Sequence, residues 1–186
     1  MDATILDKRV MEFNKLVIER FDLIFQKNVH VVEQFRNYVK IKMGNLVITV
    51  SRDEREASNS IYIGSKESSL YPLNENVLRG VFNSALKIDY VTPEAFVNNL
   101  VAFFAAEGNA LIAGNTDALK KVEKYVDKVS NEYTTELIDK QNLDAANKAW
   151  EEGNYKDFIN YLDKTDRQRL PSSYELKYKI AHQKLK

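Results

Sequence analysis

Few side chains in this sequence could do covalent or metal chemistry, and their spacing matches none of the common motifs. The chain of 186 residues has two histidines, His30 and His182, and no cysteine. The lack of cysteine excludes thiolate nucleophiles, disulfides and cysteine zinc sites, and the histidines are not at metal-ligand spacing. No His-Glu-x-x-His segment is present, and the six glycines form neither a phosphate-binding loop nor a nucleophile elbow. We therefore expect that the protein has no catalytic residue, binds no cofactor and no metal, and is not an enzyme.

The densest polar cluster is the run Arg52-Asp53-Glu54-Arg55-Glu56, close to predicted strands. Two carboxylates held together could act as a general acid and base. Alternating signs favour a solvated turn, because a carboxylate beside an arginine has its pKa lowered rather than raised. The alternative is a partner-binding loop, since loops on a rigid sheet often carry recognition. In that alternative Arg52, Asp53 and Arg55 make the contacts.

The charges balance overall but separate along the chain. With 27 basic and 27 acidic residues, the basic excess typical of nucleic-acid binders is missing, so we expect no nucleic-acid partner. Residues 132–163 hold eight acids against three lysines, whereas residues 164–186 hold seven bases against two acids. This pattern fits two solvated helix faces, or an acidic surface that steers a basic partner. The candidate residues of that surface are Glu132, Glu136, Asp139, Asp144, Glu151 and Glu152.

Composition places the chain among globular proteins. Its hydrophobic fraction is 44% and its charged fraction 29%, and a chain of this length can bury a sizeable core without metal or disulfide staples. No apolar run reaches the roughly 18 residues of a membrane helix, and no secretory signal is visible. We expect a cytoplasmic protein with no membrane partner.

Two periodicities define the first 72 residues. Apolar residues recur at steps of three and four between residues 4 and 27 and predict one helix, with Val10, Phe13, Val17, Phe21 and Ile24 on a single stripe. Apolar and polar residues then alternate from Phe35 to Gly64, with a turn at Gly44-Asn45. This predicts a three-stranded antiparallel meander, and residues 51–59 show no strand pattern. The helix is the expected cover of the buried face of the sheet.

The pattern after Pro72 is helical. Thr92-Pro93-Glu94 predicts a helix start, with threonine as the N-cap. A later apolar seam has steps of 3, 4, 3, 4 and 4, and comprises Leu119, Val122, Val126, Val129, Tyr133 and Leu137. Because the seam is under three heptads long, packing within the domain is favoured over dimerisation, and a monomer is slightly favoured.

Residues 145–171 resemble the second half of a tetratricopeptide repeat. The resemblance rests on Ala149, Gly153, Tyr155, Phe158, Ile159, Tyr161 and Pro171. It implies that Gly153 closes a tight turn between two antiparallel helices, with aromatic side chains filling the gap. About one repeat is covered, so the segment predicts one helical hairpin and no peptide-binding array.

A second resemblance spans most of residues 35–181. The segments that carry it include Ile48–Gly64, Glu132-Tyr133-Thr134, Ala149-Trp150, Leu170-Pro171-Ser172-Ser173-Tyr174 and Lys177-Tyr178-Lys179-Ile180-Ala181. These look like segments of small uncharacterised bacterial proteins that are encoded beside secreted or contact-dependent toxins and are suspected immunity proteins. The resemblance implies a cytosolic protein that binds another protein.

Together these features predict an α+β protein. Residues 1–72 are expected to form a helix plus antiparallel sheet, and residues 73–186 a helical portion with a repeat-like hairpin, the two together making one continuous globular unit. The expected function is protein binding without catalysis, specifically as a toxin-neutralising immunity protein whose acidic surface docks a basic toxin domain. The alternatives are a scaffold or adaptor that self-associates through the helical seam, and an enzyme of unrecognised type.

Overall fold

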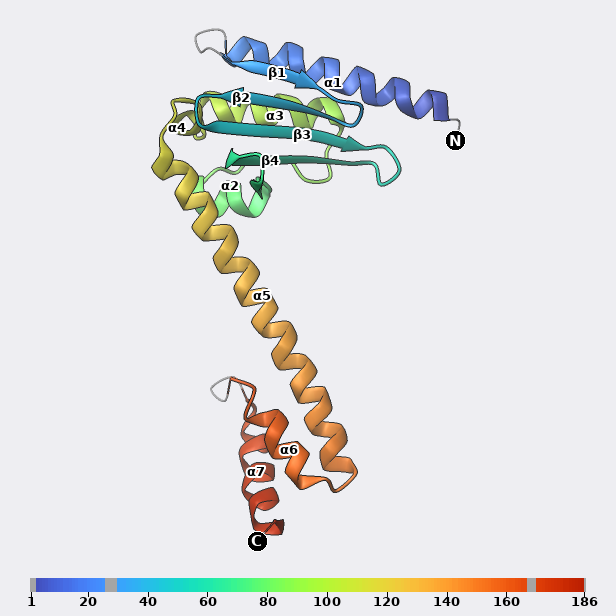
Figure 1. Cartoon of the computed structure of the whole chain (residues 1–186), viewed down its shortest axis with the longest axis vertical. Coiled ribbons are helices and arrows are strands. Elements are labelled where there is room, and N and C mark those ends of the chain that lie inside the picture. Colours follow the sequence, from blue (N-terminus) through green and yellow to red (C-terminus); the bar gives the residue numbers. More distant parts are fainter. Residues whose placement is uncertain (1–2, 26–29, 167–169, 186) are drawn as a thin grey trace. The chain divides into compact units, whose positions relative to one another are not determined.

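The computed structural model describes the backbone of residues 3–25, 30–166 and 170–185, and the side chains of these residues from Lys8 onward. The chain divides into two compact units, residues 1–127 and 128–186. Helix α5 (Thr116–Glu151) begins in the first unit and ends in the second (Figure 1). The boundary predicted after residue 72 lies inside the first unit.

The N-terminal helix α1 (Ala3–Phe25) is present as predicted, and residues 26 and 27 of the expected range lie outside the described residues. Its predicted stripe is buried: Val10, Phe13, Val17 and Phe21 are at most 8% exposed. The stripe packs against β2, β3 and helix α3. The helix therefore covers the sheet as expected, but it shares that task with α3.

The sheet has five antiparallel strands in sequential order, not the three predicted. The strands are β1 (Val31–Gln34), β2 (Tyr38–Met43), β3 (Leu46–Asp53), β4 (Ser58–Lys66) and β5 (Ser69–Pro72). The two missed strands lie at the edges and have four residues each. Such short strands carry no readable alternation, and β5 ends in a proline, which is a turn signal. The ends of β3 and β4 also extend into residues 51–59, where no strand was expected.

The three central strands carry the alternation that the sequence predicts. Val39, Ile41 and Met43 of β2 point to the core, and Ile48, Val50, Ile61 and Ile63 join them from β3 and β4. Gly44 forms the β2–β3 turn with a left-handed φ of 54°. Because the strands pair Ile41 with Ile48 and Ile48 with Ile63, these side chains form one continuous apolar layer.

Three further helices and the start of α5 complete the first unit; the three are α2 (Glu75–Phe82), α3 (Pro93–Ala105) and α4 (Asn109–Ile112). The predicted start of α3 is confirmed, since the Thr92 hydroxyl accepts a hydrogen bond from the backbone N–H of Ala95 at 3.3 Å. Phe96, Phe103 and Phe104 of α3 are fully buried. The Phe104 ring packs edge-on against Phe21 of α1 at 5.8 Å.

The second unit packs the end of α5 against α6 (Tyr155–Leu162) and α7 (Ser172–Lys184). Gly153 joins α5 to α6 with a left-handed φ of 72°, which favours glycine. The small core of the second unit contains Ala146, Ala149, Phe158, Ile159, Leu162 and Ala181. Trp150 is half-buried at the margin of this core, 5.0 Å from the Phe158 ring and under the Lys177 ammonium at 5.4 Å.

Candidate functional site

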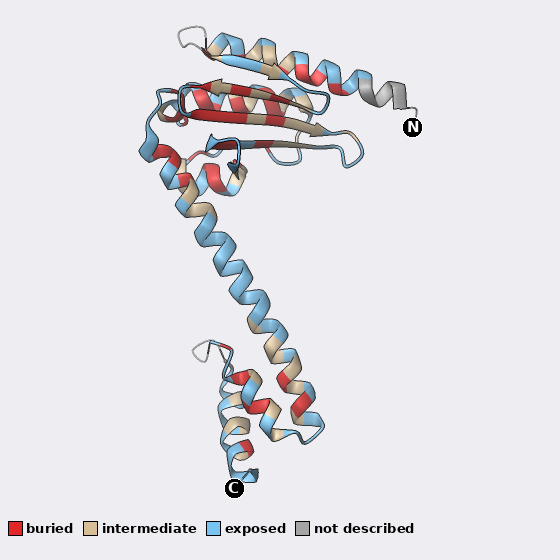
Figure 2. Ribbon diagram, in the orientation of Figure 1, coloured by how far each residue is buried: buried red, intermediate tan, exposed pale blue. Residues whose placement is uncertain are grey.

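The second unit begins with a stretch of α5 that nothing in the described structure covers. Every residue from 128 to 138 is exposed, and Figure 2 shows the stretch in continuous pale blue. Four large apolar side chains lie on it: Val129 is 42% exposed, Tyr133 68%, Leu137 44% and Ile138 49%. A spacing of four residues places Val129, Tyr133 and Leu137 on one stripe of the helix. This stripe is the later half of the predicted seam.

Local chemistry supports a helix only weakly in this stretch. Thr134 and Thr135 donate their hydroxyl hydrogens to the carbonyl oxygens four residues earlier, at 2.8 and 2.9 Å. Threonine is a poor helix former, and such back-bonding does not improve it. Lys128 and Glu132 form an exposed i,i+4 ion pair at 3.8 Å. Such a pair typically stabilises a helix by only about 0.3–0.5 kcal/mol. Most helices gain their stability from packing, which is missing here within the described residues.

Three of the predicted acidic residues flank the stripe. Glu132, Glu136 and Asp139 are separated by four and three residues and therefore share one face of α5. Glu132 and Glu136 are exposed, whereas Asp139 is half-buried and accepts a hydrogen bond from the backbone N–H of Asp166 at 3.3 Å. The structure thus brings two exposed carboxylates next to Tyr133.

The other three predicted acidic residues lie elsewhere on the unit. Asp144 follows Asp139 by five residues, which turns it by about 140° around the helix. Glu151 ends α5, and Glu152 lies just beyond it, where its carboxylate is 4.0 Å from the Lys148 ammonium. All three are exposed. The six residues therefore do not form a single acidic face.

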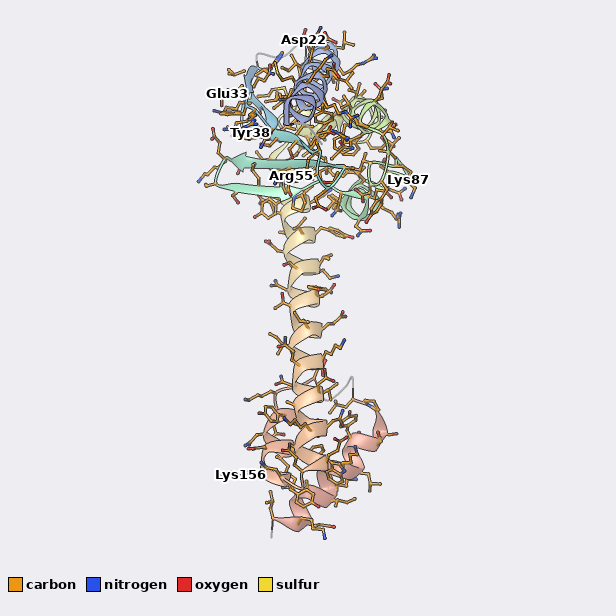
Figure 3. All side chains as sticks on the ribbon, turned by 90° about the vertical axis from the view of Figure 1, so that its right-hand side faces the viewer. Asp22, Glu33, Tyr38, Arg55, Lys87 and Lys156 are labelled. Carbon is orange, nitrogen blue, oxygen red and sulfur yellow. The ribbon has the colours of Figure 1, made fainter. Side chains whose placement is uncertain are left out.

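The hairpin between β3 and β4 holds the second predicted set of site residues. The Arg52 guanidinium donates to the Glu54 carboxylate and to the Asn59 side-chain oxygen, the latter at 2.9 Å. Asp53 accepts from the backbone N–H groups of Arg55 and Glu56 at 2.8 and 3.1 Å, and these bonds lower the pKa of Asp53. Both side chains therefore build the turn itself. Arg55 is exposed at its tip (Figure 3).

A tyrosine that the sequence did not single out lies on a nearby loop. Tyr90 is 108% exposed and has a left-handed φ of 58°, which is unusual for a bulky residue. Glu75 fixes the loop, because its carboxylate accepts from the backbone N–H groups of Ile88 and Asp89 at 3.1 and 3.0 Å. Asn59 connects the loop to the hairpin through the Val91 carbonyl at 3.4 Å. The sequence gives no signal for Tyr90, because the mixed apolar and polar residues around it form no motif or periodic pattern.

A charged cluster on the open face of the sheet was also missed. Lys42 of β2 lies 2.7 Å from both Glu33 of β1 and Glu67 of the β4–β5 turn, and Lys40 lies 2.9 Å from Glu67. Glu67 reaches this face because β5 folds back closely at Gly64, where an added Cβ would clash with the Ser69 carbonyl oxygen. The signal in the sequence was the alternating pair of lysines in β2.

The hydrogen bonds within this cluster shift its pKa values strongly. The bond from Lys42 is the largest cause that lowers the pKa of Glu67 to about 2, and Lys40 adds to it. The bonds to Glu33 and Glu67 raise the pKa of Lys42 to about 12. All four groups therefore stay charged and mutually paired near neutral pH. These ion pairs tie β1, β2 and the β4–β5 turn together and leave none of the four groups poised to transfer a proton.

The two histidines lie apart from these surfaces. The His30 imidazole is 3.6 Å from the Asp22 carboxylate, and His182 packs edge-on against the Tyr178 ring at 4.6 Å. Within the described part of the chain, no group of three or more histidine, cysteine or acidic side chains is placed to hold a metal ion.

None of the described helices combines the length and the apolar character needed to cross a membrane. Comparisons with protein-family models, with curated proteins and with solved structures found no match to this chain. The resemblance to toxin-immunity proteins therefore rests on the quoted residues alone.

Proposed function

We propose that this protein is a non-catalytic protein-binding module whose contact surface is the α5 face around Tyr133. One observation carries the proposal: Val129, Tyr133 and Leu137 form an exposed apolar stripe on a stretch of helix that nothing in the described structure covers. Tyrosine is among the residues enriched at the energetic centres of protein interfaces. A partner that packs on this stripe would also supply the packing that the helix lacks.

The best-supported partner is a basic one, as in a toxin-neutralising immunity protein. Residues 128–144 hold four acids and two lysines, and Glu132 and Glu136 lie beside the stripe. Carboxylates at the rim of an interface mainly accelerate the encounter with a basic partner. In this proposal the stripe provides the affinity and the acids steer a basic toxin domain whose active site the chain then blocks.

The test is a calorimetric titration against the protein encoded by the adjacent reading frame. We expect nanomolar binding, and Tyr133→Ala should weaken it by about 30-fold or more if the residue is an interface hot spot. Leu23→Ala is the matched control, because Leu23 is an equally exposed apolar residue (61%) on α1 of the first unit. Binding that Tyr133→Ala leaves unchanged would reject the α5 face, and no heat would reject this partner.

Charge reversal separates steering from affinity. The variant Glu132→Lys/Glu136→Lys should slow association, and the difference from wild type should shrink as salt rises. Glu151→Lys/Glu152→Lys serves as the comparison, because these two exposed carboxylates lie around the C-terminal end of α5, away from the stripe. Equal association rates for all three proteins would remove the electrostatic part of the proposal.

Self-association as a scaffold or adaptor is the second candidate, because the same exposed stripe could pair with a second copy. Sedimentation equilibrium distinguishes the two. A concentration-dependent mass that Tyr133→Ala returns to that of a monomer would favour self-association. A monomer at all concentrations would exclude it.

A further inference from the structure

Strand β1 of the first unit has one hydrogen-bonding edge that pairs with no described strand. The strand order places β1 at one end of the sheet, where it pairs only with β2. Its side chains are largely exposed, with Val31 at 54% and Val32 at 36%. An open edge of this kind is a template for pairing with another extended segment.

The pairing pattern identifies the backbone groups on that edge. The Phe35 N–H donates to the Tyr38 carbonyl at 2.9 Å, and antiparallel pairs alternate between hydrogen-bonded and non-bonded. Counting back along the register, Glu33 and Lys40 form a bonded pair, while Val32 and Gln34 face Ile41 and Val39 in non-bonded pairs. The N–H and C=O groups of Val32 and Gln34 therefore point away from β2, toward the open edge.

The two edges of the sheet differ in how they are protected. The β5 edge ends in Pro72, and its pairing with β4 is interrupted by an irregularity between Gly64 and Lys66. Prolines and bulges are devices that prevent unwanted strand pairing. Strand β1 has neither a proline nor an irregularity in its register. The sheet thus blocks one edge and leaves the other able to accept a strand.

A groove of about 580 Å³ lies beside this edge. One wall is a second stripe of α1, distinct from its buried stripe, and Gln34 of β1 contributes to the lining. Figure 1 shows α1 running alongside β1. The apolar contacts available in the groove are Met11, which is 63% exposed, and the half-buried Ile18. Its volume is within the usual range for ligand clefts, about 300 to 1,000 Å³.

The groove is preformed because α1 is tied to the β1–β2 turn. The side-chain amide of Asn14, which is fully buried, donates to the Phe35 carbonyl at 2.9 Å and to the Arg36 carbonyl at 3.4 Å. This contact fixes the spacing between the helix and the end of the strand. A preformed groove reduces the entropic cost of binding.

From these features we infer that the first unit binds an extended peptide segment of a partner protein by strand addition to β1. Two residues of the segment pair with Val32 and Gln34 through the backbone, and their side chains share the α1 side of the sheet with Met11 and Ile18. These two residues are apolar. The residue between them points to the opposite side, next to Glu33.

Charge then specifies the middle residue of the segment. On the open face, Glu33 of β1 lies directly opposite Lys40 of β2, so that the sign of the charge alternates between these two strands. Opposite charges directly across strands stabilise a sheet, and like charges destabilise it. A basic residue opposite Glu33 continues the alternation, and the preferred segment reads apolar-basic-apolar. Figure 3 labels Glu33 beside β1.

A second copy of this chain fits the edge less well. The two-fold register that uses both Val32 and Gln34 places Glu33 opposite the same residue of the second copy, which brings like charges together. The occupant is therefore a segment of another protein. This inference is independent of the α5 surface, and either one can fail without the other.

The probe is the blocked peptide Thr-Val-Arg-Val-Thr, titrated into the full-length ¹⁵N-labelled protein. We expect saturable binding with a dissociation constant below about 1 mM, and shifts confined to β1 and the groove stripe of α1. Amide exchange at Val32 and Gln34 should be fast in the protein alone and at least tenfold slower at saturation, since exchange reports hydrogen bonding.

Two control peptides separate backbone pairing from simple charge attraction. Methylation of the two valine nitrogens removes the donors to the edge and should weaken binding at least tenfold. Replacement of arginine by glutamate should weaken it to a smaller extent. Equal binding of the methylated peptide would overturn the inference.

Val32→Pro is the decisive protein variant. It removes an N–H that points to the open edge but none from the β1–β2 ladder, so the fold should persist. Slow amide exchange at Glu33 confirms that the ladder is intact. Peptide binding should fall at least tenfold in Val32→Pro and in Met11→Asp, and should be unchanged in Tyr133→Ala. Either of two results overturns the inference: no saturable binding, or a protein dimer that Val32→Pro dissociates.

Discussion

The two longest helices show how one kind of sequence pattern leads to two environments. Helices α1 and α5 both carry apolar residues at steps of three and four. In α1 the stripe is closed by the sheet and α3, so that Val17 and Phe21 are at most 1% exposed. In α5 only the start of the seam is buried, as at Val122, whereas Tyr133 is 68% exposed. Periodicity thus identifies an apolar face but does not identify what covers it.

Alanine substitution in each stripe gives the largest test of this difference. Phe21→Ala should lower the free energy of unfolding by roughly 3–5 kcal/mol, because it leaves a cavity between α1 and α3. Tyr133→Ala should change it by less than about 0.5 kcal/mol, because the ring touches little in the described structure. Urea denaturation followed by far-ultraviolet circular dichroism measures both.

The single tryptophan allows the two units to be followed separately. Trp150 packs against the core of the second unit, and the cores of the two units share no residue. Its fluorescence transition should therefore stay in place in Phe21→Ala. A large loss of stability in Tyr133→Ala would show that the α5 stripe is already covered in solution and would contradict the comparison.

Overpacking gives the next largest effect, and it separates two parts of α5 itself. Ala146 is fully buried between α5 and the helices of the second unit. Ala146→Leu should cost about 1–3 kcal/mol, because the added carbon atoms have no space. Ser130→Leu, in the uncovered stretch, should have almost no effect. Trp150 fluorescence during urea denaturation measures both effects. Similar unfolding midpoints for Ala146→Leu and Ser130→Leu would mean that the core of the second unit is loosely packed.

Much of the fold could be predicted from periodicity alone. The α1 stripe, the alternating strands β2 and β3, and the threonine cap of α3 all follow from local patterns. The two edge strands could not be predicted, because four residues are too few to show a period of two. Strand β1 exists because β2 offers it a ladder, and that contact is not local in sequence.

The candidate sites were less predictable for the same reason. Arg52 and Asp53 looked available for a partner, yet their hydrogen bonds close the turn in which they lie. The α5 seam looked like internal packing, but its later half is exposed. The edge of β1 depends on which backbone groups face outward, and no property of the side chains reveals this.

Glycine substitution at two exposed tyrosines should give smaller effects of opposite sign. Tyr90 has a left-handed backbone, which costs a bulky residue roughly 1–2 kcal/mol. Tyr90→Gly relieves this strain but adds the entropic cost of ordering a glycine, so the variant should stabilise the first unit by about 0.5–1 kcal/mol. Tyr133→Gly should destabilise the second unit by about 0.5 kcal/mol, because glycine is a poor helix former. Thermal unfolding of both variants checks the signs. A destabilised Tyr90→Gly would mean that the ring contributes to the fold.

The smallest expected effect concerns the ionic cluster of the sheet, which contrasts with the exposed ion pair between Lys128 and Glu132 on the uncovered stretch of α5. The hydrogen bonds from Lys42 and Lys40 hold the pKa of Glu67 at about 2, below its usual value of 4.5. Its contribution to stability is therefore complete above pH 4.5 and is lost as the pH falls through 2. Glu67→Gln should unfold with a shallower pH dependence in that window, and the difference from wild type should shrink in 1 M salt. An equal pH dependence of unfolding for the two proteins would mean that the lysines stabilise the Glu67 carboxylate no better than water does. The charges on the open face of the sheet would then contribute no more to stability than the exposed ion pair on α5.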